Sequence, residues 1–198
     1  MKTIQYFFSP KSPWTYFGHA RLLAMAERHQ AVIVPKPADL GKIFPISGGL
    51  PLEKRAPQRQ AYRIHELKRW SRRLDLPLNI HPKFFPVDDT DASLMITSII
   101  KSDNINDALT LSGRLLSAVW AEEKNIADAD TLIEIANAAG LDGAKLYAER
   151  QEGAPLFEQY TQEAADLQVF GVPWYIYRDE PFWGQDRLDL LDWTLSSD

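Results

Sequence analysis

The sequence predicts an α/β protein in which a four-stranded mixed sheet is interrupted by a long helical block. Three observations support this fold class. A buried strand, a long helix and a second strand follow one another in residues 3–34. About 110 residues with helical patterns and few strand signals come next. Strand character returns only at 172–183, just before a last amphipathic helix.

The first elements form a strand–helix–strand unit. Residues 3–8 (TIQYFF) are rich in β-branched and aromatic side chains, which is typical of a buried strand. Over residues 10–29, apolar side chains recur at helical spacing. A second apolar run covers 31–34 and is expected to end at Pro35 and Pro37. A helix of this length between two strands implies parallel pairing.

The middle of the chain reads as a loop followed by helices. Residues 39–57 are rich in loop signals, with SGGLP at 47–51 as a flexible centre. Gly140 is well placed to end the helix that starts near Asp130. The expected helices span 58–74, 91–102, 105–124, 130–139, 142–151 and 154–167.

A predicted hairpin and a final helix complete the chain. Its two strands are 172–177 and 181–183, and the helix starts near Gln185. The order βαβ, helical insertion, ββα is that of a thioredoxin-like domain interrupted by an all-α insertion. We assign 1–36 and 168–198 to the thioredoxin-like domain and 37–167 to the helical insertion domain.

Composition narrows the function classes. The net charge is −5 and basic residues are scattered, which argues against a nucleic-acid partner. No apolar run approaches the roughly 20 residues that cross a bilayer, so we expect no membrane partner. The absence of cysteine and of a signal peptide fits a cytoplasmic protein. The four histidines are dispersed without metal-ligand spacing, so we expect no metal.

The tetrad Ser9-Pro10-Lys11-Ser12 stands where the first strand gives way to a helix. Free N–H groups and the helix dipole lower the pKa of a thiol at such a place, which is how Cys-x-x-Cys motifs work. Serine holds both cysteine positions here, and its hydroxyl can donate to a thiolate that a ligand brings. The alternative is helix punctuation, since Ser is a favoured N-cap and Pro a favoured first helical residue.

Two later segments belong to the same argument. A cis Val172–Pro173 bond would present the Val172 backbone as a strand edge for an extended peptide, whereas the alternative is a simple strand start. Asp186 lies in the first turn of the last helix, where a carboxylate is usually a dipole partner. It could instead bind the α-ammonium of a γ-glutamyl group. The order of all three pieces on the predicted frame is more specific than any single one.

With these residues the chain resembles the glutathione-dependent isomerases and kappa-class glutathione transferases, and more closely the 2-hydroxychromene-2-carboxylate isomerase family of aromatic catabolism. The resemblance covers essentially the whole chain. It implies glutathione as the cofactor, a small aromatic substrate and a homodimer. The segments that carry it are FFSPKSPWTYFG at 7–18, AYRIHELKRWSRRLDLP at 61–77, WAEEKNIADADTLIEIANAAGLD at 120–142, FGVPWYIY at 170–177 and FWGQDRLDLL at 182–191.

The resemblance also implies roles for single residues. Ser9 matches the serine that contacts the glutathione thiolate and is the expected catalytic residue. Val172, followed by Pro173, matches the residue whose backbone pairs with the cysteinyl part. Asp186 matches the acid that holds the γ-glutamyl ammonium, and Gln185 is its polar neighbour.

Some positions depart from the family pattern. Arg59 stands where the family has lysine and can hold the glycyl carboxylate. Gly49 stands where the family often has asparagine, and Lys11 where tyrosine or phenylalanine is common. The candidate substrate-pocket residues are Lys11, Ser12, Trp14, Phe84, Phe85 and Trp183. For each aromatic residue among them, the alternative is core packing.

The implied reaction is cis–trans isomerisation by reversible addition of the thiolate to a conjugated double bond. Lys11 or Arg59 could stabilise the substrate oxygen that gains negative charge. Two alternatives stay open at this point: kappa-like conjugation of electrophiles, and a non-catalytic binding protein with a thioredoxin fold. Disulfide exchange is excluded because the chain has no thiol.

Overall fold

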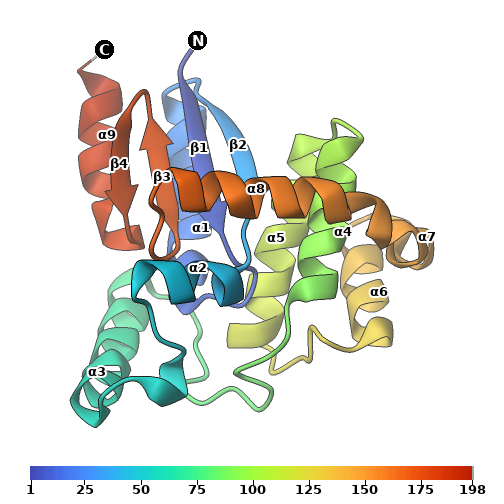
Figure 1. The fold of residues 1–198 in the computed structure, drawn as a ribbon, viewed down its shortest axis with the longest axis horizontal. Coiled ribbons are helices and arrows are strands. Elements are labelled where there is room, and N and C mark those ends of the chain that lie inside the picture. Colours follow the sequence, from blue (N-terminus) through green and yellow to red (C-terminus); the bar gives the residue numbers. More distant parts are fainter. Residues whose placement is uncertain (198) are drawn as a thin grey trace.

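The computed structural model describes residues 1–197 and contains the predicted four-stranded mixed sheet, in the order β2-β1-β3-β4 (Figure 1). The central strand β1 (Thr3–Phe8) pairs in parallel with β2 (Val32–Pro37) and antiparallel with β3 (Trp174–Tyr177). β4 (Glu180–Trp183) pairs with β3 as the second strand of the expected hairpin. The α/β, thioredoxin-like fold with its helical insertion is therefore confirmed.

The prediction that Pro35 and Pro37 end the second strand is wrong, because β2 continues to Pro37. Val32 and Ala38 donate their N–H groups to carbonyls of the β1 segment, at 2.8 and 2.9 Å. Alternate residues point the same way along a strand, so the two prolines direct their nitrogens away from β1. Since β2 is an edge strand, these missing donors cost no ladder hydrogen bond.

The crossover helix α1 spans Pro13–Arg28, so it begins three residues later than predicted. Ser12 is its N-cap, and its hydroxyl accepts the Thr15 N–H at 3.2 Å. The Ser12 N–H donates to the Ser9 carbonyl at 3.1 Å, which closes a turn between the strand and the helix. The capping role considered for Ser9 thus belongs to Ser12.

The segment predicted as a loop, 39–57, contains a helix. α2 spans Leu40–Ser47 and begins where the Asp39 carboxylate accepts the Gly41 N–H at 2.8 Å. Gly48 ends it with a φ of 74°, a left-handed conformation that glycine adopts without strain. Capping therefore outweighed the loop signals of this segment.

The insertion is helical as predicted, with most boundaries within one residue of expectation. Its helices are α3 (Pro57–Leu74), α4 (Thr90–Lys101), α5 (Ile105–Trp120), α6 (Ala129–Ala138), α7 (Gly143–Glu149) and α8 (Ala154–Asp166). Short 3-10 turns cover Leu52–Lys54 and Arg150–Gly153. α5 ends four residues earlier than predicted, whereas Gly140 follows α6 with a φ of 83°, as a helix-ending glycine should.

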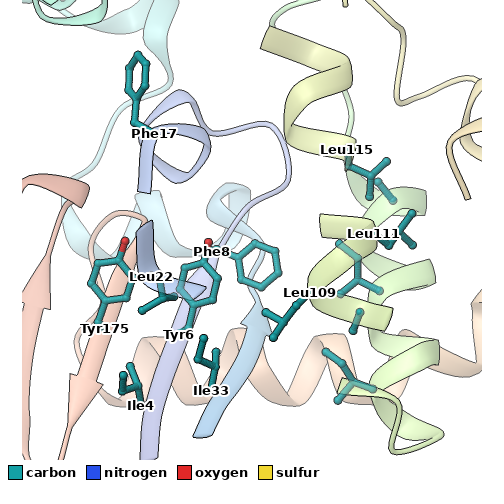
Figure 2. Packing of buried hydrophobic residues seen from close by; sticks show 14 of the residues in the cluster. Ile4, Tyr6, Phe8, Phe17, Leu22, Ile33, Leu109, Leu111, Leu115 and Tyr175 are labelled. Carbon is teal, nitrogen blue, oxygen red and sulfur yellow. The ribbon is translucent and has the colours of Figure 1, made fainter. Parts of the chain in front are cut away.

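The sheet is covered on both faces, which explains why the consecutive residues 6–8 are all buried. One buried cluster joins Tyr6 and Phe8 to side chains of α1, α4 and α5, so sheet and insertion share a core (Figure 2). Tyr6 stacks between Phe8 and Tyr175, with ring centroids 4.6 and 5.5 Å apart. On the opposite face, Phe7 packs under α2 and under α8, which crosses the sheet in Figure 1.

The chain closes with a 3-10 turn, Gln185–Arg187, that leads directly into α9 (Leu188–Ser196). The predicted helix start near Gln185 therefore coincides with the 3-10 turn. Among residues 1–197, no helix combines the length and apolar character that a membrane span requires.

Candidate functional site

Ser9 lies just beyond the end of β1 and is almost fully buried, with 1% of its surface exposed. Its hydroxyl donates to Oδ2 of Asp89 at 2.6 Å. The short distance is that of a charge-assisted hydrogen bond. The candidate catalytic hydroxyl is therefore already held by a carboxylate from the insertion.

Asp89 also binds Lys11, whose Nζ lies 2.8 Å from Oδ1. The Lys11 side chain is 31% exposed and that of Asp89 is 16% exposed. One carboxylate thus bridges the Ser9 hydroxyl and the Lys11 ammonium. The three side chains form a compact group, which we call the Ser9–Lys11–Asp89 cluster.

Sequence reasoning missed Asp89. It occupies the N-cap position of α4, yet its side chain caps nothing. Asp88 does this work, accepting the Thr90 N–H at 3.0 Å and the Thr90 hydroxyl at 2.7 Å. These hydrogen bonds hold the pKa of Asp88 below its usual value. Two successive acids before a helix are the available signal, but they do not tell which one caps.

The Val172–Pro173 peptide bond is cis, as predicted. Residue pairs of β1 and β3 run from Ile4↔Tyr177 to Phe7↔Trp174, so Val172 precedes β3 at the end of the sheet where Ser9 follows β1. Val172 is 6% exposed, and within residues 1–197 its backbone N–H and carbonyl have no hydrogen-bond partner. The backbone N–H and carbonyl of Val172 are therefore available to a ligand, at the end of the sheet where Ser9 lies.

The third predicted piece reaches the same end of the sheet. The Gly184 N–H donates to the Pro173 carbonyl at 2.9 Å, which ties the end of β4 to the cis-proline turn. Asp186 follows as an exposed residue whose Oδ2 accepts from Nη1 of Arg187 at 2.8 Å. Gln185 is buried, and its Oε1 accepts from Arg21 at 2.6 Å. Gln185 thus positions the turn, while the Asp186 carboxylate faces solvent.

Arg59 lies exposed in the first turn of α3, where its charge acts on Arg55. Burial, and after it the Arg59 charge, lower the pKa of Arg55. No contact joins Arg59 to the Ser9–Lys11–Asp89 cluster within residues 1–197. Its role toward a glycyl carboxylate stays a prediction.

Gly49 has a structural explanation. A Cβ atom at this position would lie 2.4 Å from Cδ1 of Phe44, closer than side-chain atoms approach one another. An asparagine would therefore have to displace the Phe44 ring. Glycine at this position lets the Phe44 ring pack against the turn that follows α2.

The predicted pocket residues divide into two groups. The Phe85 ring lies 4.7 Å from that of Trp120, whose Nε1 donates to the Lys11 carbonyl at 3.1 Å. Trp120, which sequence reasoning missed, therefore contacts both Phe85 and the backbone of Lys11. Trp183 packs instead on Phe170, with ring centroids 4.6 Å apart.

The remaining pocket residues have local roles. The hydroxyl of Ser12 is used as a helix cap, Trp14 packs beside Phe17 within α1, and Phe84 lies under the ammonium of Lys83. Two surface hollows lie elsewhere. One is lined by Met1, Lys2, Thr3, Tyr177 and Arg178, and the other by residues of α4, α5 and α7 and the adjoining turns. Among residues 1–197, no group of three His, Cys, Asp or Glu side chains gathers as a metal site.

Comparison with known proteins identifies relatives that match the chain over nearly its whole length. The profile of the DSBA-like thioredoxin domain matches residues 3–196. The 2-hydroxychromene-2-carboxylate isomerase of Sphingobium xenophagum is 26% identical over 194 residues, which cover 96% of each chain. The isomerase of the same name from Pseudomonas putida is 25% identical, covering 96% of this chain and 92% of the relative. These full-length matches confirm the resemblance found in the sequence.

Solved structures agree on the fold. A 2-hydroxychromene-2-carboxylate isomerase superposes with a TM-score of 0.82 at 22% identity, covering 98% of this chain and 95% of the other. A probable DsbA oxidoreductase from Streptomyces coelicolor gives 0.79 at 16% identity, covering 100% and 89%. The cytosolic disulfide reductase DsbM of Pseudomonas aeruginosa, solved with GSH, gives 0.69 at 15% identity, covering 98% of each. On the domain match over nearly its whole length, this chain belongs to the family of DSBA-like thioredoxin domains.

Proposed function

We propose that the protein is a glutathione-dependent cis–trans isomerase of the 2-hydroxychromene-2-carboxylate isomerase type. One observation carries the proposal: Ser9, the Val172 backbone and the Asp186 turn meet at one end of the sheet, in a chain without a cysteine. A thioredoxin-like site of this kind has to obtain its sulfur from a ligand. The relatives that bear the isomerase name match at 24–26% identity over 194 residues.

The residues present fit glutathione at three points. The unpaired N–H and carbonyl of Val172 offer one donor and one acceptor, which an extended peptide satisfies. The exposed carboxylate of Asp186 can accept hydrogen bonds from an α-ammonium. The Ser9 hydroxyl can donate to a thiolate. When bound, glutathione would supply a thiolate that adds reversibly to a conjugated double bond, allowing rotation about it.

Ser9 has to change its hydrogen-bond partner for this chemistry. A hydroxyl has one proton to donate, and in the structure Asp89 accepts it. A hydrogen bond from this hydroxyl to sulfur would stabilise the thiolate by about 1.5–3 kcal/mol. The lost bond to Asp89 offsets part of that gain, so we expect the thiol pKa to fall by about one unit. Lys11 meanwhile stays beside Asp89 and offsets its negative charge. The dipole of α1 adds partial positive charge at this end of the helix.

Titration of glutathione into the protein tests the proposal. Thiolate absorbance at about 240 nm, followed against pH, gives the thiol pKa of the bound cofactor. We expect a pKa below that of free glutathione, and Ser9→Ala to move it back up by about one unit while isomerase turnover falls at least about tenfold. Ser196→Ala, at the exposed end of α9, is the matched control. Absence of binding at millimolar glutathione would reject both glutathione-dependent functions, isomerisation and conjugation.

Isomerisation and conjugation differ in the fate of the thiol. In isomerisation the sulfur leaves again, so the amount of free glutathione is unchanged after many turnovers. In conjugation one thiol is consumed for each product molecule. Counting free thiols after turnover of a cis-configured aryl-conjugated carboxylate therefore decides between them.

A further inference from the structure

Arg63 is an unusually placed cation. It lies in α3 one turn after Arg59, and its guanidinium carbon is 5.4 Å from the centre of the Phe85 ring and 5.7 Å from that of Trp120. Cations attract the faces of aromatic rings, and the attraction grows when water is excluded. Phe85 is partly exposed, whereas Trp120 is fully buried. The guanidinium thus packs against two aromatic rings, and only the Phe85 ring is accessible to a ligand.

The charge of Arg63 is not offset by a carboxylate of the described residues 1–197. Within residues 1–197 its guanidinium has no hydrogen-bond or ion-pair partner, although Lys36, Arg21 and Arg150 each contact a carboxylate. Burial, and after it the charge of Arg55, lower the pKa of Arg63 to about 10, so it stays charged at neutral pH. An unpaired, partly buried guanidinium is available to pair with an anion that a ligand brings.

Trp120 connects this cation to the cluster at Ser9. One face of its indole supports Arg63, and its Nε1 donates to the Lys11 carbonyl at 3.1 Å. Lys11 is itself bound to Asp89, which holds the Ser9 hydroxyl. One aromatic ring therefore separates Arg63 from the backbone of Lys11, a member of the Ser9–Lys11–Asp89 cluster.

We propose that Arg63 binds the carboxylate of a planar, conjugated substrate, and that the Phe85 ring contacts its unsaturated part. The proposal rests on the function proposed above and names the residue that recognises its substrate class. The guanidinium offers a planar fork that matches a carboxylate with two parallel hydrogen bonds. Lys11 is less suited to this role, because Asp89 already offsets its charge.

Calorimetric titration of the glutathione-free protein with cinnamate and with its uncharged analogue cinnamamide tests the proposal. We expect cinnamate to bind at least about tenfold more tightly, because only the carboxylate can pair with Arg63. Arg63→Met should abolish this preference. Arg63→Lys should keep part of it, since an ammonium retains the charge without the fork. Arg73→Met, an exposed change on the same helix, should leave it intact.

The outcomes separate the two proposals. Equal binding of cinnamate and cinnamamide by the unmodified protein overturns the role of Arg63, even if Arg63→Met fails to fold. Unchanged cinnamate preference in a folded Arg63→Met protein does the same. Glutathione binding, followed by thiolate absorbance, should be the same in Arg63→Met as in the unmodified protein. If neither protein binds glutathione, the glutathione-dependent function is rejected. The carboxylate site is still supported in that case when the unmodified protein prefers cinnamate and Arg63→Met does not.

Discussion

Ser9 and Lys11 share one carboxylate, and the properties of each depend on it. Asp89 accepts the Ser9 hydroxyl at 2.6 Å and the Lys11 ammonium at 2.8 Å, so it sets where both point. A negative charge beside a thiolate raises the thiol pKa, and a positive charge lowers it. The cluster therefore balances a repulsive and an attractive charge at the place where the sulfur is expected.

Replacing Asp89 by asparagine should make bound glutathione more acidic. The neutral amide removes the repulsion, holds the Ser9 hydroxyl less tightly and leaves Lys11 without its counter-ion. All three effects lower the thiol pKa, by about one unit or more. The pH dependence of thiolate absorbance measures the shift, with Asp107→Asn, a change at an exposed acid of α5, as the control. An unchanged or higher pKa would mean that Asp89 does not act on the sulfur.

At the scale of elements, the place where α1 begins determines the different roles of Ser9 and Ser12. Ser12 caps α1 through the Thr15 N–H, and this leaves Ser9 three residues outside the cap. The two serines of the tetrad therefore differ in role. Ser9 places a hydroxyl at the candidate site, whereas Ser12 accepts a first-turn N–H that has no partner within the helix.

Ser12→Ala should lower the free energy of unfolding by about 1 kcal/mol, because a buried N–H of the first turn loses its acceptor. Urea unfolding measures the loss. Ser12→Thr, which keeps a capping hydroxyl, should recover most of it. If the alanine variant unfolds at the same urea concentration as the unmodified protein, the cap contributes nothing to stability.

At the scale of the whole molecule, His19 joins the sheet, α1 and α5. Its Nε2 lies 3.0 Å from the Leu109 carbonyl and its Nδ1 lies 3.2 Å from the Tyr6 hydroxyl. A carbonyl can only accept, so Nε2 carries the proton and Nδ1 accepts from Tyr6. Burial lowers the pKa of His19 to about 4, opposed by the hydrogen bond to Leu109. The neutral ring is thus part of the core that the sheet and the insertion share.

This linkage predicts acid sensitivity. The unfolded chain takes up a proton on His19 near pH 6.5, whereas the folded protein resists protonation down to about pH 4. The contribution of His19 is therefore complete above pH 6.5, and below it the free energy of unfolding falls by up to about 1.4 kcal/mol per pH unit. Denaturant titrations between these pH values should show a shallower slope for His19→Gln. His81→Gln, an exposed control, should match the unmodified protein, and equal slopes in all three would refute the linkage.

Local patterns were sufficient for much of the fold. The apolar run at 3–8, the helical spacing at 58–74 and the glycine at 140 each act through neighbours in the chain, and the structure has the corresponding elements. Predictions failed where local signals conflicted. Pro35 and Pro37 would interrupt an inner strand, but only the sheet order shows that β2 lies at an edge.

The sequence by itself determined the opening strand–helix–strand unit, the helical insertion and the closing hairpin, together with the cysteine-free tetrad and the acidic turn after β4. These are local features, and the strand order implied by βαβ and ββα units brings them to one end of the sheet. Only the tertiary structure decided that Asp89, eighty residues along the chain, binds the Ser9 hydroxyl, and that Arg63 lies against Phe85 and Trp120. Such contacts join residues whose separation in sequence carries no periodic signal. They arise from how the insertion packs against the sheet, which no local pattern specifies.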